Sequence, residues 1–597
     1  MQRKALAEGA RFLGAALWLG LAASAVVAGL RAHAFARPGF VFLPLWEHAL
    51  PTTLLLAVLA CASWTLAFGL LARRVQGELA RTRFALVLPW GAASAALLYY
   101  VHRHFPSGRS TPARLAADAA LALFLLALGW SVSLAIHHGR RRAGNRTAVV
   151  GALAGLVGTA TLPLLARIEH DSGPHVFVLL VDVLRADHLG CYGYELPTSP
   201  NIDRFAQDAV LFEQAMSQST FTKTSVASIF TGLYPHHHGV YVGNLQDEEN
   251  RITSDVLDPG LTTLAEEMRW RGFLTLGLVQ NGQLRSYMGF DQGFDLYDDD
   301  PGDLPAAAET FRRLCAGSAA RRRIFAYLHF LDLHGPYLPR PPYATRFGRY
   351  SDRYDDMDLE QWRAHFLAVQ SGAESLPEKD ARQLQALYDG QLTFVDEWIG
   401  NVLADLRDAG LYDESLIVFT ADHGEGFLEH GFISHSTTPF EELVHVPLIV
   451  KLPHARNAGA RVAAPVGSID LLPTLLALVG GEGFDPRDGR SLVDLLQGPS
   501  ADATSPRMLA SEYQGSVAVR EGRWKWIDEP GGRGQALYDL ETDPGEKVDR
   551  QAEFDEIAQR LALRAQDVHA LRPERGRSER VEVDAETQAE LRALGYF

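Results

Sequence analysis

Cysteine is scarce in this 597-residue chain, which contains only Cys61, Cys191 and Cys315. A disulfide framework needs several cysteine pairs and is therefore excluded, and no cysteine spacing of the structural zinc type occurs. Internal repeats and low-complexity tracts are also lacking, which excludes a solenoid architecture. No cleavable signal peptide is apparent, because the first apolar stretch is long and four more follow it.

Formal charge is missing from five apolar stretches near the start of the chain, at 12–30, 49–72, 84–101, 119–136 and 147–166. Each has close to the about 20 residues that cross a bilayer as a helix. Basic residues are densest before the first stretch and in the second and fourth loops, so the positive-inside rule places the N-terminus in the cytoplasm. We therefore expect residues 1–170 to form a five-helix domain in the inner (cytoplasmic) membrane, with residues 171–597 on the periplasmic or extracellular side. A transporter is disfavoured, because the five stretches carry no charged residue.

The whole chain has fewer basic than acidic residues, and its formal net charge is −16. Residues 1–170 hold 17 Lys+Arg and 5 Asp+Glu, a net charge of +12, whereas the remainder holds 39 and 67, a net charge of −28. An acidic exported domain argues against nucleic acid as a partner. The membrane is an expected partner because of the five apolar stretches, and the motifs that follow lead to a small-molecule or lipid-linked ester substrate.

Apolar runs typical of buried parallel strands follow the polar link at 167–174. They lie at 176–181, 274–279, 324–330 and 415–420, and a long helix is predicted at 381–410. Strands alternating with helices predict an α/β fold with a mixed, mostly parallel sheet sandwiched by helices in a catalytic domain at 171–500. Shorter strand-like runs and a closing helix at 553–572 predict a small antiparallel α+β subdomain at 501–597.

Polar residues follow two of these strands: Asp182 comes after 176–181, and Asp422 and His423 come after 415–420. Ligands gather beyond the carboxyl ends of strands in open α/β sheets, and carboxylate and imidazole groups suit zinc or manganese. Thr222 precedes a helical run, and a helix N-terminus favours anions. The four residues predict a metal site in which Thr222 is both ligand and acidified nucleophile. An ordinary helix cap is the alternative interpretation of Thr222.

The order of motifs along the chain resembles the sulfatase family of the alkaline phosphatase superfamily. The motifs include VDVLRADHLGCYGY, TKTSVASIFTGLYPHHHGV, YLHFLDLHGPY and FTADHGEGFLEHG, and the resemblance covers nearly all of residues 174–550. It implies an alkaline-phosphatase-like α/β core, one divalent ion (Zn, Mn, Ca or Mg) and ester cleavage through a covalent intermediate. Asp182, Asp422 and His423 fall on metal positions, Thr222 on the nucleophile, and His334 on the histidine near the leaving group.

Departures from the family pattern narrow the expected chemistry. Residues 222–226, TKTSV, stand where sulfatases have Cys-x-Pro-x-Arg, so no formylglycine can form. Val183 replaces a second Asp, residues 279–283 replace the usual Gly-Lys-x-His, and His435 stands about where a substrate-binding Lys usually is. This set is similar to that of the lipoteichoic acid synthases and phosphoethanolamine transferases, which also have five membrane helices, an exported catalytic domain and a metal-bound Thr.

The expected function is a membrane-anchored, metal-dependent hydrolase or transferase of phosphate or sulfate esters, acting on a lipid-linked or envelope substrate. Thr222 attacks the phosphorus or sulfur, and His334 or His435 protonates the leaving group. Phosphorus is favoured, because a threonine ester cannot collapse to an aldehyde and must be attacked by water or another acceptor. The residues expected to contact the ester oxygens are Lys223, Asn281 and His238. The alternatives are a sulfuric ester hydrolase without formylglycine and a catalytically inactive binding protein.

Overall fold

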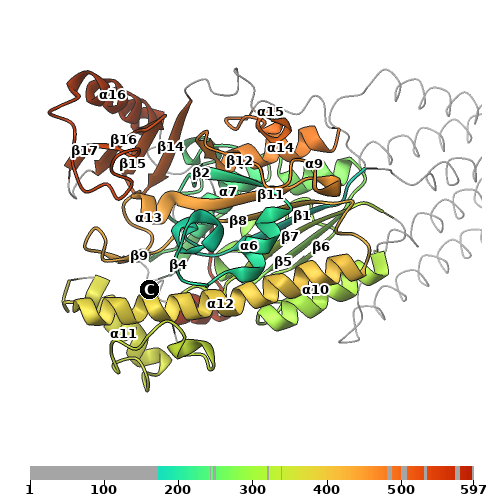
Figure 1. Ribbon diagram of the computed structural model, residues 1–597, viewed down its shortest axis with the longest axis horizontal. Helices are drawn as coiled ribbons and strands as arrows, with labels where there is room; N and C mark the ends of the chain where they lie inside the picture. The colour runs from blue at the N-terminus through green and yellow to red at the C-terminus, as the bar shows by residue number, and fades with distance from the viewer. Residues whose placement is uncertain are drawn as a thin grey trace, which may run out of the picture. The chain divides into compact units, whose positions relative to one another are not determined.

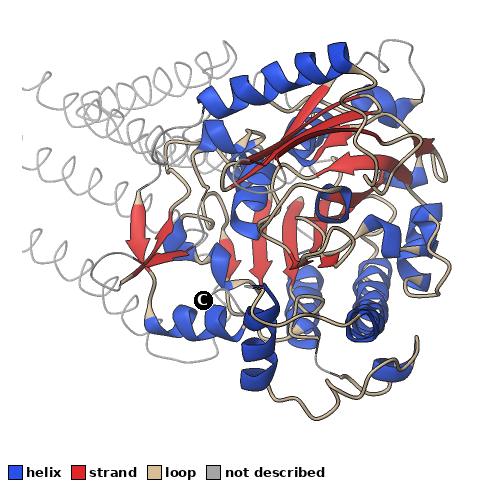
Figure 2. Cartoon of the chain, turned by 90° about the vertical axis from the view of Figure 1, so that its left-hand side faces the viewer, coloured by secondary structure: helices blue, strands red, loops and turns tan. Residues whose placement is uncertain are grey.

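The centre of the fold is a nine-stranded sheet within the part of the chain that the structure describes (Figures 1 and 2). The computed structural model describes residues 173–241, 244–246, 251–318, 322–337, 339–370, 372–480, 487–498, 507–529, 534–571 and 579–594. The chain divides into two units, Met1–Arg167 and Ile168–Phe597, and all the described residues belong to the second.

The strands of the central sheet run in the order β12-β2-β11-β8-β1-β7-β5-β6, and β13 also pairs with β2. Their bounds are β1 Val176–Val181, β2 Val210–Met216, β5 Leu274–Val279, β6 Leu296–Asp298, β7 Ile324–Phe330, β8 Leu416–Ala421, β11 His445–Lys451, β12 Arg461–Val462 and β13 Val466–Gly467. All pairings are parallel except those of β11, which runs antiparallel to both β2 and β8. The prediction of a mixed, mostly parallel sheet is confirmed.

Helices cover both faces of this sheet. In Figure 1, α6, α10 and α12 lie on one face and α7, α9 and α14 on the other. Their bounds are α6 Pro200–Gln207, α7 Thr222–Thr231, α9 Leu264–Trp270, α10 Leu304–Ser318, α12 Glu378–Asp408 and α14 Leu471–Leu478. The central strand β1 is apolar at every position because it is buried on both faces, as a parallel strand between two helical layers must be.

Two smaller sheets flank the central one. The first is antiparallel and consists of β14 Met508–Tyr513, β15 Ser516–Glu521, β16 Trp524–Glu529 and β17 Gly534–Asp539, with α16 Asp555–Leu571 packed on it. The second has the order β18-β4-β3, with bounds Arg580–Glu582, Ile252–Asp255 and Asn244–Gln246. The predicted antiparallel C-terminal sheet and its closing helix are therefore present, whereas the predicted domain boundaries stay a prediction.

Short elements complete the described chain: α8 Pro235–His238, α11 Leu359–Gln370, α13 Glu441–Val444, α15 Val493–Gln497, α17 Ala585–Ala593, β9 Gly426–Phe427 and β10 Ile433–Ser434. Among the described residues, no helix has the length and apolar character that a bilayer crossing requires. The five stretches predicted to span the membrane, at 12–30, 49–72, 84–101, 119–136 and 147–166, lie outside the described residues.

Candidate active site

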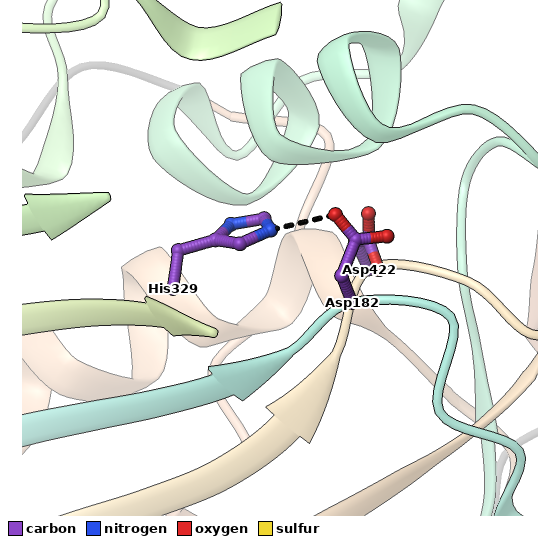
Figure 3. A group of neighbouring side chains, drawn as sticks. All are labelled: Asp182, His329 and Asp422. Carbon is purple, nitrogen blue, oxygen red and sulfur yellow. Dashed lines mark hydrogen bonds and ion pairs between the residues drawn. The ribbon is translucent and has the colours of Figure 1, made fainter. Parts of the chain in front are cut away.

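The carboxyl ends of β1 and β8 bring two aspartates together. These strands are parallel neighbours, so Asp182 and Asp422, each directly after its strand, meet at one edge of the sheet (Figure 3). Oδ1 of Asp422 accepts the backbone N–H groups of Val183 (3.2 Å) and His423 (2.9 Å). Oδ2 of Asp182 accepts hydrogen bonds from Nδ2 of Asn281 (2.6 Å) and from the ring of a neighbouring histidine. The two side chains are fully buried.

One oxygen of each aspartate has no hydrogen-bond partner among the described residues, namely Oδ1 of Asp182 and Oδ2 of Asp422. Burying a carboxylate oxygen without a partner is costly unless a cation compensates its charge. The donors present, carboxylate oxygens beside imidazole nitrogens, are those that zinc and manganese accept. The site therefore fits a divalent ion, which would be held by the predicted set of Asp182, Asp422, His423 and Thr222.

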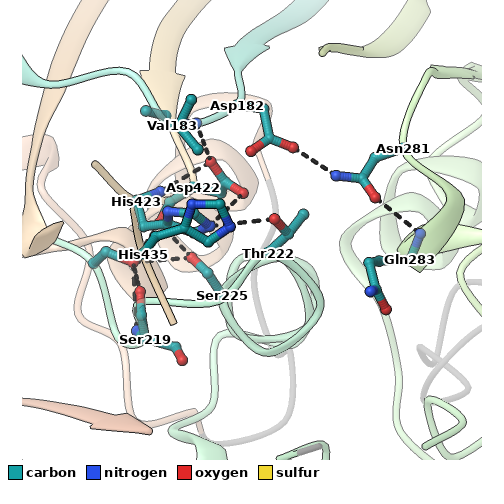
Figure 4. Close-up of polar contacts among 12 residues, drawn as sticks. Asp182, Val183, Ser219, Thr222, Ser225, Asn281, Gln283, Asp422, His423 and His435 are labelled. Atoms are coloured by element: carbon teal, nitrogen blue, oxygen red, sulfur yellow. Dashed lines mark hydrogen bonds and ion pairs between the residues drawn. The ribbon is translucent and has the colours of Figure 1, made fainter. Parts of the chain in front are cut away.

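Thr222 lies beside His423. Its Oγ1 is 3.2 Å from Nε2 of His423, and both side chains are fully buried (Figure 4). Nδ1 of His423 is 2.9 Å from the carbonyl oxygen of Gly424, and because a carbonyl only accepts, Nδ1 carries the proton. Nε2 is then the ring nitrogen that faces the Thr222 hydroxyl. This ring is set to orient the hydroxyl or to share a ligand with it.

Helix α7 starts at Thr222, but Thr222 does not cap it. The N-cap residue is Phe221, which supplies no capping side chain, and the first helical bond joins Ser225 N to Phe221 O. The N–H groups of the first turn come before this first helical hydrogen bond, and they lie at the positive end of the helix dipole. The helix ends at Gly232, whose φ of 67° suits a residue without a side chain. The hydroxyl of Thr222 is left for the site rather than for the helix.

His329 is a member of the site that the sequence analysis did not select. It lies in β7, adjacent to β1, and a ligand atom from each of Asp182, His329 and Asp422 falls within 4.8 Å of the other two (Figure 3). Its Nε2 is 2.9 Å from Oδ2 of Asp182, and its Nδ1 is 2.9 Å from the hydroxyl of Tyr327. The sequence does contain a signal for His329. It is a histidine inside the otherwise apolar run 324–330, in the strand next to the one that Asp182 follows.

The charges around Asp182 favour its ionised form. Burial raises the pKa of Asp182, but the hydrogen bond and the charge of His329, together with His334 and His423, lower it by more. The pKa of this carboxyl group therefore lies well below its usual range. Asp182 is ionised at neutral pH, as a metal ligand must be.

Val183, which stands where a second Asp would be expected, has a positive φ of 54°. This left-handed region is strongly disfavoured for a β-branched residue and costs on the order of 1–3 kcal/mol. The strained conformation aims the Val183 N–H at Asp422. The backbone at this position thus holds the Asp422 carboxylate, while its apolar side chain offers no ligand atom.

His334 and His435 lie together next to His423. The ring centroid of His435 is 4.9 Å from that of His334 and 4.6 Å from that of His423. Nδ1 of His435 is 3.1 Å from Oε1 of Glu425, whose other oxygen accepts the hydroxyl of Tyr337. Glu425 is buried and was not selected from the sequence, although it lies only two residues after His423.

The two histidines have opposite pKa shifts. Burial lowers the pKa of His435, but the charge and hydrogen bond of Glu425 raise it by more, so the net shift is upward. Burial and the neighbouring His435 lower the pKa of His334. Nδ1 of His334 donates to the carbonyl oxygen of Gly335 at 2.6 Å, which fixes its orientation. Opposite shifts in adjacent groups are typical of sites that separate acid from base roles.

The three residues predicted to contact the ester oxygens are held by internal hydrogen bonds. Burial lowers the pKa of Lys223 to about 7, and its Nζ contacts Ser254 and donates to the Asp255 carbonyl oxygen at 3.1 Å. His238 uses both ring nitrogens, at 3.0 Å from Ser228 Oγ and 3.1 Å from Val240 N. The structure thus brings neither side chain into the Asp182–Asp422 cluster.

Asn281 does join the cluster, but through Asp182. Its Nδ2 donates to that carboxylate, and its Oδ1 accepts from Gln283 N at 2.8 Å (Figure 4). The carboxamide of Gln283 is fully buried, and neither of its polar atoms has a hydrogen-bond partner among the described residues. Contact between the ester oxygens and Lys223, Asn281 or His238 stays a prediction.

The fold and this site define an ester hydrolase with the alkaline-phosphatase-like architecture. The chain belongs to the sulfatase family, whose model matches residues 174–481.

A curated relative, the multifunctional alkaline phosphatase superfamily protein PehA of Trinickia caryophylli, is 26% identical over 401 residues, covering 54% of this chain and 77% of the relative. Arylsulfatase A of Bos taurus is 26% identical over 456 residues, covering 67% of this chain and 88% of the relative. The phosphonate monoester hydrolase of Agrobacterium radiobacter shares the fold with a TM-score of 0.54 at 22% identity, covering 67% of this chain and 95% of that chain. These comparisons support the predicted hydrolase class and fold.

Loss of His329 is expected to weaken metal binding. His329→Gln removes the imidazole that orients Asp182, and a residue that orients a metal ligand typically contributes 10–100-fold to metal affinity. We expect a dissociation constant for Mn²⁺ or Zn²⁺ about 10–100-fold higher than that of the unaltered protein, measured by isothermal titration calorimetry. Tyr327→Phe removes the second bond of the same ring and should have a smaller effect in the same direction. Equal affinities in all three proteins would show that the ring has no part in metal binding.

Proposed function

We propose that this protein cleaves phosphate or sulfate esters through a covalent intermediate on Thr222. The observation that supports this proposal most directly is the position of the Thr222 hydroxyl at the start of α7, 3.2 Å from His423 Nε2. Two buried carboxylate oxygens without partners, on Asp182 and Asp422, support the same assignment. Conversion of a cysteine to formylglycine has no part in this proposal, because threonine occupies the position.

The proposed reaction has two displacements. In the first, Thr222 Oγ1 bonds to phosphorus or sulfur, its proton passes to solvent, and the bond to the leaving oxygen breaks. His435 or His334 donates a proton to that oxygen, as a general acid does. In the second, water or an acceptor alcohol gives its proton back to that histidine and attacks the threonine ester; the bond to Thr222 Oγ1 breaks, and this oxygen regains a proton from solvent. The N–H groups at the start of α7 stabilise the anionic group throughout.

Asp182, Asp422, His423 and Thr222 would hold a divalent ion, which would supply a Lewis acid that lowers the pKa of an oxygen donor and neutralises charge on the ester. The surrounding chain contributes geometry: the hydroxyls of Ser217 and Ser225 donate to the Asp422 carbonyl oxygen and hold the turn after β8 against α7. This contact fixes the distance between the nucleophile and the aspartate.

We propose that phosphate esters are preferred over sulfate esters as substrates. A phospho-threonine can be resolved by water or an acceptor, whereas a sulfated threonine lacks the exit that a formylglycine hydrate provides. Comparison of bis(p-nitrophenyl) phosphate with p-nitrophenyl sulfate tests this preference, and we expect kcat/KM for the diester to be at least about 10-fold higher, a difference of about 1.4 kcal/mol. Faster sulfate cleavage would support the alternative of a sulfuric ester hydrolase. Absence of turnover and of metal binding would support an inactive binding protein.

We further propose that residues 1–170 anchor the enzyme in the inner membrane and that its substrate is lipid-linked or part of the envelope. The support is the five uncharged stretches, because a simple anchor needs only one. External protease is expected to cleave the catalytic domain in spheroplasts, whereas a cytoplasmic marker protein stays intact. Protection of the domain until the cells are lysed would contradict the predicted orientation.

A further inference from the structure

The last described segment of the chain returns to the central fold. β18 pairs with β4, and Val583 and Leu591 are buried in the main hydrophobic core. Helix α17 follows Asp584, whose side chain caps it by accepting Thr587 N at 2.8 Å. This segment, residues 579–594, lies beyond the residues that the sulfatase family model matches. Its position is therefore fixed by packing on the catalytic fold, not by the antiparallel sheet that precedes it in the chain.

Glu590 on α17 contacts the loop that follows β5. Its Oε2 is 2.5 Å from Nη2 of Arg285. A side-chain Cβ placed on Gly282 would lie 2.7 Å from this oxygen, so the carboxylate of Glu590 packs closely against the Gly282 backbone. The side chains of Glu590 and Arg285 are largely buried, with 26% and 11% exposed, so solvent screens this ion pair less than one on the surface.

The Gly282 backbone connects Glu590 with the active site. Gly282 directly follows Asn281, whose Nδ2 donates to Asp182 at 2.6 Å. The short helix Gly282–Leu284 begins here, and the Asn281 side chain caps it by accepting Gln283 N. A carboxylate that packs against Gly282 and pairs with Arg285 therefore restrains this short helix, and with it the Asn281 side chain that contacts Asp182.

We propose that Glu590 is a positioning residue of the active site, and that α17 holds Asn281 in place to orient Asp182. The proposal rests on the assignment of Asp182 to the metal site. Glu590 contacts no reacting atom. It acts through Gly282 and Asn281, so its effect must disappear when Asn281 can no longer contact Asp182.

A double-mutant cycle on metal affinity tests this coupling. We expect Glu590→Ala to raise the dissociation constant for Mn²⁺ about 3- to 10-fold, less than the 10–100-fold typical of a residue that directly contacts a ligand. Glu590→Gln keeps the size of the side chain and an oxygen that can accept from Arg285, and it should restore part of the affinity. In the Asn281→Ala background, Glu590→Ala should cause no further loss. The thermal midpoint is recorded for every variant, so that unfolding is separated from a local effect.

Glu586→Ala is the matched control, because Glu586 lies on the exposed side of the same helix. It should leave the Mn²⁺ affinity unchanged. Full additivity of the Glu590 and Asn281 substitutions, or an unchanged affinity in Glu590→Ala, would overturn the positioning role while leaving the proposed function intact. If Glu590→Ala does not fold, the Glu590→Gln cycle decides by the same criterion. If the unaltered protein binds no divalent ion, both proposals fail.

Discussion

Thr222→Ala is expected to lower kcat by at least about 10³-fold while the protein keeps its fold. The variant lacks the hydroxyl oxygen that forms the covalent ester proposed here. Thr222 is fully buried at the first position of α7, and its hydroxyl does not cap the helix, so removing it leaves the helix start unchanged. The measurements are steady-state turnover of a phosphodiester and the thermal midpoint of each protein. Mass spectrometry of acid-quenched enzyme should show the adduct in the unaltered protein only.

Thr224→Ala is the matched control for this substitution. Thr224 lies two residues further along the same helix, is fully buried, and its hydroxyl has no hydrogen-bond partner among the described residues. It loses the same atoms in the same helical turn, so any general effect of the change should appear in both proteins. Turnover by Thr222→Ala at the level of Thr224→Ala would refute the nucleophile assignment.

Asp422→Asn is expected to abolish metal-dependent stabilisation and to lower turnover by about 10³-fold or more. The amide oxygen of asparagine can still accept the N–H groups of Val183 and His423, so the local backbone is retained. The lost charge leaves Asp182 as the only carboxylate of the predicted set. A ligand at 100 times its dissociation constant stabilises a protein by about 2.7 kcal/mol, so the thermal midpoint of the unaltered protein should rise on adding Mn²⁺ and that of the variant should not.

Without metal, the variant is expected to be at least as stable as the unaltered protein. Asp182 and Asp422 place two buried carboxylates within 4.8 Å, and neutralising one of them removes their repulsion. Asp187→Asn serves as the control, because Asp187 is 58% exposed and pairs with Arg185 outside the metal cluster. A metal-induced rise of the midpoint that is equal in both variants would show that Asp422 does not bind the ion.

Two residues depart from the sulfatase pattern that the chain resembles. Thr222 stands where the resemblance places the nucleophile, and Val183 stands where many sulfatases have a second Asp. The structure shows how the fold accommodates the second change: the Val183 backbone adopts a positive φ and donates to Asp422. Two carboxylates and two imidazoles thus surround the site, and His329 contributes the second of these rings.

Several elements could be predicted because their sequence signals are local. The apolar runs 176–181 and 324–330 coincide with β1 and β7, and the run at 415–420 is displaced from β8 by one residue. The predicted helix at 381–410 agrees with α12, Glu378–Asp408, to within three residues at its ends. A strand buried on both faces must be apolar throughout, so a run of adjacent apolar residues is enough to predict it.

The sequence by itself determined the order of strands and helices, the carboxyl-end placement of Asp182 and Asp422, and the threonine at the start of α7. Only the tertiary structure decided that His329, Glu425 and Glu590 belong to the neighbourhood of the site. The contacts of two of them span long stretches of sequence: Glu590 is 308 positions from Gly282, and His329 is 147 from Asp182. The physical reason is that periodicity and capping report contacts within a few residues, whereas hydrogen bonds across strands and loops depend on how the sheet is assembled.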